Sequence, residues 1–317
     1  MTKPALAVLG PTASGKSDLA IELALRFDGE VVNCDSVQVY KGLDGGSAKV
    51  PEDERRGVPH HMLDVIDPRE HCTAGDYARM ARPVLREIAD RRKIPVVAGG
   101  TGCYFRSLTE GLFQGPRRDE DLRARLEVTQ KRHGVSYLHR LLTRLDPKSA
   151  GRIHANDLPK VTRALEIRIL GNELLAQGFE RGRDSLEGFR FMKFALNPPR
   201  EELYDRIDAR ASVLFDRGLV HEVRSLIESG VPTESWALGS HGYAQAVKLI
   251  HNEMTLEDAI ESTALVTRQY SKRQRTWFTR QESNVVWLEG FGTNPAIIDD
   301  AARQVSGWLE STPTPSC

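Results

Sequence analysis

The chain has 317 residues, of which 40% are hydrophobic, so it can bury a large core and is expected to divide into two lobes. Its 44 lysines and arginines balance 44 aspartates and glutamates, which excludes a net attraction of the whole molecule for nucleic acid and leaves only local patches for polyanions. The four cysteines have no paired spacing and no apolar run approaches ~20 residues, so we expect no disulfide framework, zinc site, secretion or membrane insertion, and a cytoplasmic location.

The first informative segment is GPTASGKS, a complete G-x-x-x-x-G-K-S phosphate loop. It joins a predicted buried strand, Ala5–Gly10, to a predicted helix, Asp18–Phe27, which is the context that a working loop needs. Glycines let the backbone wrap around phosphate oxygens, the helix start aims N–H groups at them, Lys16 adds a charge and Ser17 can hold Mg²⁺. The alternative is a turn that only looks like a phosphate loop. The residues expected to surround a polyphosphate are Gly10, Pro11, Thr12, Ala13, Ser14, Gly15, Lys16 and Ser17.

Two further short apolar strands follow in the first 110 or so residues. One is Glu30–Asp35, which ends in a carboxylate, and the other is Ile94–Ala98, which runs into the glycine-rich turn GGTG. Buried strands separated by helices predict an α/β fold with a parallel sheet, whose ligand groups gather at the carboxyl ends of the strands. We therefore expect the phosphate loop, Asp35 and Thr101 to converge on one crevice.

The position of Asp35 allows three roles. It is a general base that deprotonates whatever attacks the bound polyphosphate, an outer ligand of Mg²⁺, or a cap on the following turn. Thr101 either presents its hydroxyl to the same crevice or serves only as a turn residue.

After residue 116 the pattern changes to charged helical segments without good strands. This predicts a helical insertion domain at 117–184, between the two parts of a phosphate-loop core at 1–116 and 185–317. In the second part we expect a strand at Phe189–Leu196, a long helical stretch at Arg200–Glu228, a helix at Thr255–Gln281 and a strand at Val285–Leu288. The terminal sequence STPTPSC is expected to be disordered.

A basic segment lies within the last long helix. Residues 268–281 contain no acidic residue and interleave basic with aromatic side chains. Such a helix either meets a phosphodiester backbone or is simply a solvated face, and the aromatics either meet bases or belong to the core. The basic residues are Arg268, Lys272, Arg273, Arg275 and Arg280, and the aromatics are Tyr270, Trp277 and Phe278.

Six segments together resemble the tRNA dimethylallyltransferase family. They are GPTASGKS, CDSVQVYKGLD at 34–44, VPHHMLDV at 58–65, GGTGCYFRSLTEGL at 99–112, RALEI at 163–167 and TRQYSKRQRTWF at 267–278. The phosphate loop is shared by many nucleotide enzymes, but DSVQVY together with TRQ-x-x-KRQ-x-TWF is highly specific. The order and spacing match over nearly the whole chain.

The resemblance implies transfer of a dimethylallyl group from dimethylallyl diphosphate to N6 of the adenosine 3′ of the anticodon, with Mg²⁺ as cofactor. The loop would then hold the diphosphate leaving group. By the same resemblance Asp35 is the base at N6, Thr101 positions the reacting groups, Gln38 reads the extruded adenine, and Lys16 and Arg210 face the diphosphate. We expect a monomer that binds the anticodon stem-loop of tRNA. Its expected tRNA contacts are Asp35, Ser36, Val37, Gln38, Thr101, Arg123, Pro159, Lys160, Arg163, Lys272, Arg273 and Arg275.

The chain departs from the family pattern in three places. The usual D-I-G-T-A-K reads DGGSAK here, so Gly45 adds freedom to the backbone; a usual Q-R pair reads Pro159-Lys160; and Ala244 replaces a basic residue. Two rival functions remain beside the transferase. One is a small-molecule or nucleoside kinase that uses the loop for ATP and Asp35 to activate a hydroxyl, which leaves the basic helix unexplained. The other is a non-catalytic tRNA-binding protein with a vestigial loop.

Overall fold

The computed structural model describes residues 2–112, 115–116, 118–171 and 184–311. Contacts divide the chain into two compact units, a core unit up to Thr109 and from Leu186 onward, and an insertion unit at Glu110–Ser185. Part of the expected insertion, residues 117 and 172–183, and most of the terminal STPTPSC expected to be disordered lie outside the described residues. Within these described ranges, no helix is both long and apolar enough to cross a membrane.

The core unit is built on a parallel sheet, which confirms the expected fold class. In the described part of the chain the sheet has six strands in the order β3-β2-β4-β1-β5-β6, and every neighbouring pair is parallel. The edge strand β3 was not predicted, because two residues are too few to show any periodicity. The strands are β1 (Lys3–Leu9), β2 (Gly29–Asn33), β3 (His60–His61), β4 (Ile94–Gly99), β5 (Phe189–Leu196) and β6 (Val285–Leu288).

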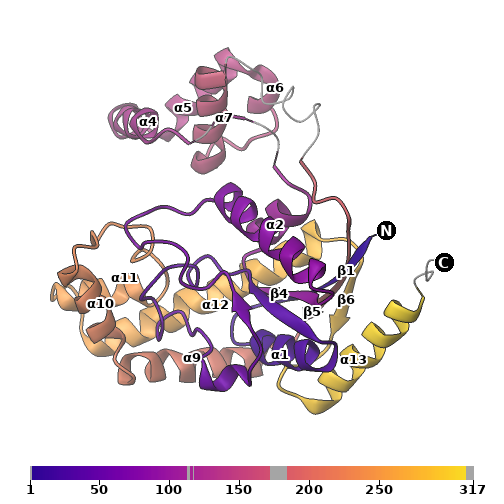
Figure 1. The fold of residues 1–317 in the computed structure, drawn as a ribbon. Helices are drawn as coiled ribbons and strands as arrows, with labels where there is room; N and C mark the ends of the chain where they lie inside the picture. The colour runs from indigo at the N-terminus through magenta and orange to yellow at the C-terminus, as the bar shows by residue number, and fades with distance from the viewer. Residues whose placement is uncertain (1, 113–114, 117, 172–183, 312–317) are drawn as a thin grey trace. The chain divides into compact units, whose positions relative to one another are not determined.

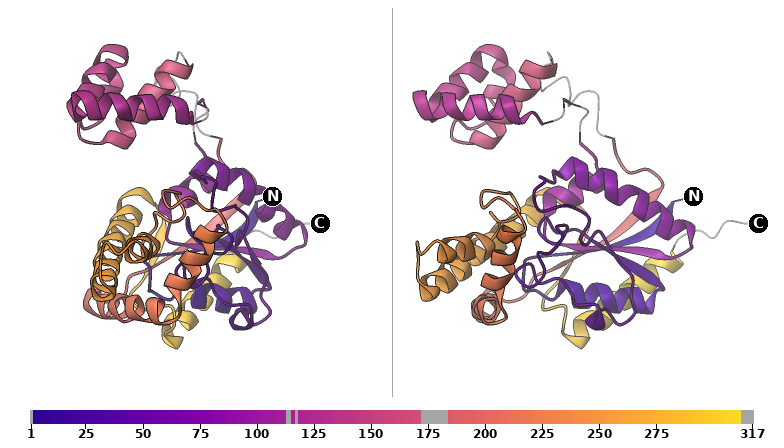
Figure 2. Two further views of the ribbon diagram at one scale, coloured as in Figure 1. Left: turned by 90° about the vertical axis from the view of Figure 1, so that its left-hand side faces the viewer. Right: turned by 60° about the vertical axis from the view of Figure 1, so that its left-hand side comes forward.

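Both faces of the sheet are covered by helices, which explains why β1 is continuously apolar from Ala5 to Leu9 rather than alternating. Leu6 and Val8 pack in a buried cluster with side chains of α1 and α13, whereas Ala7 and Leu9 pack in another with side chains of α2, α3 and α12. Figures 1 and 2 show α1 and α13 on one side of the sheet and α2 on the other. The helices of the core unit are α1 (Lys16–Arg26), α2 (Ala74–Asp90), α3 (Gly102–Thr109), α9 (Arg200–Asp216), α10 (Leu219–Glu228), α11 (Tyr243–Ile250), α12 (Leu256–Gln281) and α13 (Pro295–Glu310).

The predicted strands at Phe189–Leu196 and Val285–Leu288 are confirmed, but other boundaries differ. The first strand ends before Gly10, whose φ of 142° leaves the strand conformation, and β2 ends at Asn33, which places Asp35 in a loop. The single helical stretch expected at Arg200–Glu228 is wrong: Gly218 has φ 97° and separates α9 from α10. Left-handed glycine commonly ends a helix.

Helix α12 has a well-defined start. Thr255 caps it, with its hydroxyl accepting from the Asp258 N–H while the Asp258 carboxylate accepts from the Thr255 N–H. This reciprocal capping box satisfies two backbone donors that have no partner inside the helix. The helix, 26 residues long, then runs without a break to Gln281.

The insertion unit has its own small core. Its described helices are α4 (Glu120–His133), α5 (Val135–Leu145), α6 (Pro147–Ala150) and α7 (Leu158–Gly171), which enclose a leucine-rich cluster. The Glu166 carboxylate is fully buried and accepts from Arg123 at 2.9 Å, from Arg163 at 2.6 Å and from the Asp119 N–H at 2.7 Å. Burial by itself would raise the pKa of Glu166, but these hydrogen bonds outweigh it and lower the pKa to about 2.

We expect Glu166→Gln to destabilise the insertion unit by about 2 kcal/mol at pH 7, because it leaves two guanidinium groups without their buried counter-charge. A depressed pKa stabilises the fold above the ordinary value near 4.5, and this contribution is lost as the pH falls toward about 2. The difference between variant and wild type should therefore shrink over that range. Amide hydrogen exchange of α4 and α7 at several pH values measures it.

The matched control is Glu120→Gln, which removes an exposed carboxylate of α4 and should change exchange little. Equal effects of the two substitutions would show that the buried cluster does not stabilise this unit.

Candidate active site

Three loops meet at the carboxyl ends of β1, β2 and β4, where the parallel sheet was predicted to gather them. The Cys34 N–H donates to the Ala98 carbonyl at 2.8 Å, and the Thr101 N–H donates to the Cys34 carbonyl at 3.3 Å. The Ser36 N–H donates to the Thr101 hydroxyl at 3.0 Å. These bonds join the loop that carries Asp35 to the GGTG turn. Thr101 is thus both a turn residue and a contact of the Asp35 loop.

The phosphate loop is held by hydrogen bonds within itself and by one from the segment that follows β6. The Ser14 hydroxyl and the Lys16 ammonium both donate to the Pro11 carbonyl, at 2.8 and 2.7 Å. Behind the loop the Gly292 N–H donates to the Ser14 carbonyl at 2.9 Å. A Cβ at Gly15, whose φ is 84°, would lie 2.9 Å from the Thr293 nitrogen, so this position requires glycine.

Three charged side chains of the site, those of Lys16, Asp35 and Arg210, act on one another. Burial lowers the pKa of Lys16 to about 8, the nearby Asp35 carboxylate acts in the opposite direction, and Arg210 adds to the lowering. Burial also lowers the pKa of Arg210, again opposed by Asp35. Arg210, from α9, therefore lies in the same electrostatic neighbourhood as Lys16 and Asp35. The site holds two partly desolvated cations beside one carboxylate.

Asp35 does cap the turn that follows it. Its Oδ1 accepts from the Val37 N–H at 2.8 Å and from the Gln38 N–H at 3.3 Å. In the described part of the chain, no hydrogen bond engages its Oδ2. One oxygen thus fixes the orientation of the carboxylate, and the other remains available for chemistry, so capping does not compete with the role of base.

The side chain of Gln38 hydrogen-bonds to backbone carbonyls of a neighbouring loop. Its Nε2 donates to the Ser47 and Ala48 carbonyls at 3.0 and 3.1 Å, so its amide nitrogen anchors the DGGSAK loop. That loop is not loosened by its extra glycine: the Asp44 and Gly45 N–H groups donate to Glu222 at 3.1 and 2.8 Å. Glu222, from α10, was not identified from the sequence.

The second glycine of the loop, Gly46, is required because a side chain would not fit there. A Cβ at Gly46 would lie 2.5 Å from the Tyr243 ring and 2.6 Å from Leu219. Tyr243 in turn donates its hydroxyl to Glu222 at 2.5 Å. The start of α11 therefore packs directly on the DGGSAK loop.

Two aromatic rings beside the site were also missed. His241 and Tyr270 lie with ring centroids 4.9 Å apart. Burial lowers the pKa of His241, Arg273 lowers it further and Asp35 opposes them, so the imidazole is neutral at pH 7. Burial raises the pKa of Tyr270, and the neighbouring Thr101 and Gln274 side chains act in the opposite direction. The sequence left two roles open for Tyr270, a contact with bases or a place in the core, and did not indicate that it lies beside Thr101.

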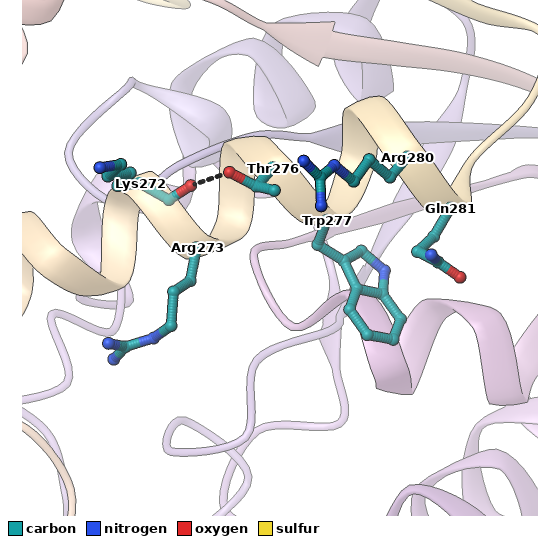
Figure 3. Close-up of a pocket in the computed structure, with 6 residues that line it drawn as sticks. All are labelled: Lys272, Arg273, Thr276, Trp277, Arg280 and Gln281. Atoms are coloured by element: carbon teal, nitrogen blue, oxygen red, sulfur yellow. Dashed lines mark hydrogen bonds between the residues drawn. The ribbon is translucent and has the colours of Figure 1, made fainter. Parts of the chain in front are cut away.

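The basic helix divides its charges between surfaces. Figure 3 shows Arg273, Trp277 and Gln281 extending from one side of α12, with Lys272 and Arg280 directed elsewhere. Arg268 is paired with Asp208 at 2.6 Å, and Phe278 is 1% exposed and belongs to the core. A pocket of about 300 Å³ is lined by Lys272, Arg273, Thr276, Trp277, Arg280 and Gln281. A second, of about 200 Å³, is lined by Asn197, Pro198, Pro199, Arg200, Arg275 and Glu289.

The remaining expected tRNA contacts belong to the insertion unit. Arg123 and Arg163 are engaged by Glu166, as described above. Pro159 and Lys160 are exposed in the first turn of α7, where Lys160 pairs with Asp157. Their role toward RNA stays a prediction.

Comparison with known proteins gives consistent matches. Residues 38–281 match the family described as IPP transferase, and residues 4–68 match one described as isopentenyl transferase. The tRNA dimethylallyltransferase of Solibacter usitatus is 51% identical, covering 96% of this chain and 99% of that protein, and its namesake in Koribacter versatilis is 48% identical, covering 96% and 98%.

Solved structures are similar as well. The full-length tRNA isopentenylpyrophosphate transferase of Bacillus halodurans is 35% identical with a TM-score of 0.71, covering 98% of this chain and 97% of that one. A eukaryotic dimethylallyltransferase described as acting on tRNA is 27% identical with a TM-score of 0.81, covering 99% of this chain and 81% of that one.

We expect anions to bind the phosphate loop less tightly as the pH rises through about 8, because only the protonated Lys16 attracts them. Calorimetric titration with inorganic pyrophosphate at pH 7 and pH 9 should show a loss of roughly tenfold beyond the titration of pyrophosphate itself. The control is Lys16→Met, whose weaker binding should follow the titration of pyrophosphate alone. Identical pH profiles for the two proteins would remove Lys16 from the anion site.

Proposed function

The chain belongs to the IPP transferase family, and we infer from this membership that it is an enzyme that modifies tRNA by prenyl transfer. It moves a dimethylallyl group to N6 of the adenosine 3′ of the anticodon and releases diphosphate. The observation that carries this inference is the meeting of the phosphate loop, the Asp35 loop and the GGTG turn at the carboxyl ends of three adjacent parallel strands.

The reaction requires stabilisation of the negative charge that develops on the leaving diphosphate. An exocyclic adenine amine is a weak nucleophile because its lone pair is delocalised into the ring, so the allylic carbon must become cationic as diphosphate departs. We propose that dimethylallyl diphosphate binds with its phosphates on the loop amides, beside Lys16 and Arg210. Cations that are already desolvated stabilise the charge that develops on diphosphate without further reorganisation.

A magnesium ion fits this proposal. Mg²⁺ keeps several waters and is often held by only one or two protein oxygens together with substrate phosphates, so a hydroxyl at the loop is an adequate protein ligand. Ser17, the first hydroxyl residue after Lys16, would supply it. When bound, the ion would neutralise charge on the departing diphosphate.

We propose that Asp35 takes the proton from N6. The Val37 and Gln38 amides hold its Oδ1, and Oδ2 would accept the proton as the new C–N bond forms. The Thr101 hydroxyl, bonded to the Ser36 N–H, would orient the reacting groups beside it. For Gln38, the carbonyl oxygen is the end of the side chain that would read the adenine, since its nitrogen anchors Ser47 and Ala48.

The tRNA would be held mainly through its phosphates. N6 of a paired adenine is engaged inside a duplex, so the target base must be unpaired, which an anticodon loop provides. The exposed Lys272 and Arg273 on α12 would neutralise phosphates near the site. We propose that the enzyme acts as a monomer.

The transfer reaction and the kinase alternative make different products. Wild-type protein incubated with dimethylallyl diphosphate, Mg²⁺ and unmodified tRNA should yield N6-dimethylallyl adenosine after nuclease digestion, detected by mass spectrometry, with release of one pyrophosphate for each modified base. A parallel incubation with ATP and nucleosides should give no phosphorylated nucleoside. A phosphorylated nucleoside in the second incubation, with no modified adenosine in the first, would establish a kinase.

We expect Asp35→Asn to lower single-turnover transfer by about 10²- to 10⁴-fold while tRNA affinity stays near wild type, because the amide keeps the shape of the carboxylate but cannot accept the proton. Filter binding and rapid-quench kinetics separate the two quantities. Equal losses of affinity and rate would mean that Asp35 positions the adenine and is not the base.

A further inference from the structure

Gln274 lies on the inner side of the basic helix and connects two loops of the site. It is 4% exposed. Its Oε1 accepts from the Thr12 N–H at 2.8 Å, and its Nε2 donates to the Gly100 carbonyl at 2.9 Å. The phosphate loop and the GGTG turn are therefore bridged by one side chain from α12.

The structure makes room for this amide. A Cβ at Gly100 would lie 2.1 Å from the Gln274 Nε2, so any other residue at Gly100 would displace the side chain. A glutamine can donate and accept at the same time, and both of its polar ends are used here. The site is matched to an amide of this length.

The contact falls at a point where the phosphate loop needs support. Thr12 directly precedes Ala13, a non-glycine residue with φ 63°, and such left-handed conformations persist only when their surroundings hold them. The other side-chain bonds of the loop converge on Pro11, before Thr12. Gln274 fixes the Thr12 amide from outside the loop, so this N–H is directed toward α12.

We propose that Gln274 is a positioning residue for the transfer reaction: it fixes the phosphate loop against the GGTG turn, so that the helix that meets tRNA also sets the geometry of the diphosphate site. The inference rests on the proposed function. Tyr270, one turn earlier on α12, lies beside both Gln274 and Thr101, whose side chains act on its hydroxyl, and so links Gln274 to the Asp35 side of the site. Lys272 lies two residues before Gln274 and is exposed, so the two sides of α12 serve different substrates.

The first test is Gln274→Met, which keeps the approximate volume of the side chain and removes both hydrogen bonds. We expect kcat/KM for dimethylallyl diphosphate to fall by about 30- to 100-fold, the effect of losing two buried hydrogen bonds, with the tRNA Kd within about twofold of wild type. Thr279→Ala, an exposed residue further along α12, is the control and should leave both quantities unchanged.

Lys272→Ala should show the opposite pattern. It should raise the tRNA Kd and flatten the dependence of log K on log salt by roughly 0.7 to 0.9, while the KM for dimethylallyl diphosphate stays near wild type. Comparable losses of tRNA affinity in Gln274→Met and Lys272→Ala would assign Gln274 to the tRNA surface and overturn the proposal.

A second variant separates positioning from general damage to the fold. In Gln274→Glu a carboxylate oxygen would face the Gly100 carbonyl, whereas the protonated acid can again donate to it and accept from Thr12. The ratio of variant to wild-type kcat/KM should therefore rise by about tenfold as the pH falls from 8.5 to 6.5, since burial raises the pKa of an acid at this place. A ratio that does not change with pH, or wild-type kinetics in Gln274→Met, overturns the proposal. Because wild type is assayed in parallel, failure of the proposed function itself would appear as no transfer by any protein.

Discussion

The site depends on one close contact between two backbones, where Gly99 at the end of β4 lies against Cys34 just after β2. A Cβ at Gly99 would be only 2.0 Å from the Cys34 carbonyl oxygen, so the contact exists only with glycine. It brings the Cys34 carbonyl to the Thr101 N–H, and through the Thr101 hydroxyl it sets the position of Ser36. The proton acceptor proposed at Asp35 is thus placed by backbone geometry, which is stiffer than any arrangement of side chains.

The arrangement of charged side chains in the site is the second constraint. Lys16 and Arg210 are brought together, and the Asp35 carboxylate opposes their charge. Two neighbouring cations are costly to hold out of water, and a multiply charged anion relieves that cost. The stability lost in arranging them becomes part of the recognition of diphosphate, and an electrically neutral ligand would gain nothing from it.

Residues near one another in the chain were the predictable part of this site. The phosphate loop is a contiguous motif, and parallel strands bring their carboxyl ends together, so the meeting of Lys16, Asp35 and Thr101 could be predicted. The break at Gly218 and the start of α13 at Asn294-Pro295 carried ordinary helix-end signals.

Contacts between distant segments could not be predicted in this way. Glu222 and Gln274 act on loops more than 170 residues away, and no local pattern shows which distant backbone groups they contact. For α12, composition showed a basic segment, but only the structure shows that Arg275 lines a different pocket from Lys272.

The contacts of α12 with both substrates' sites also limit which insertions the sequence can tolerate. Each residue added to a helix turns everything beyond it by about 100°. A single insertion between Thr255 and Gln274 would bring Arg273 to the place of Gln274, and a guanidinium has no acceptor for the Thr12 N–H. Exposed positions of this helix that contact neither substrate can therefore accumulate substitutions in evolution, whereas its length up to Gln274 cannot change. Insertions would instead be accommodated before the Thr255 cap or after Gln281.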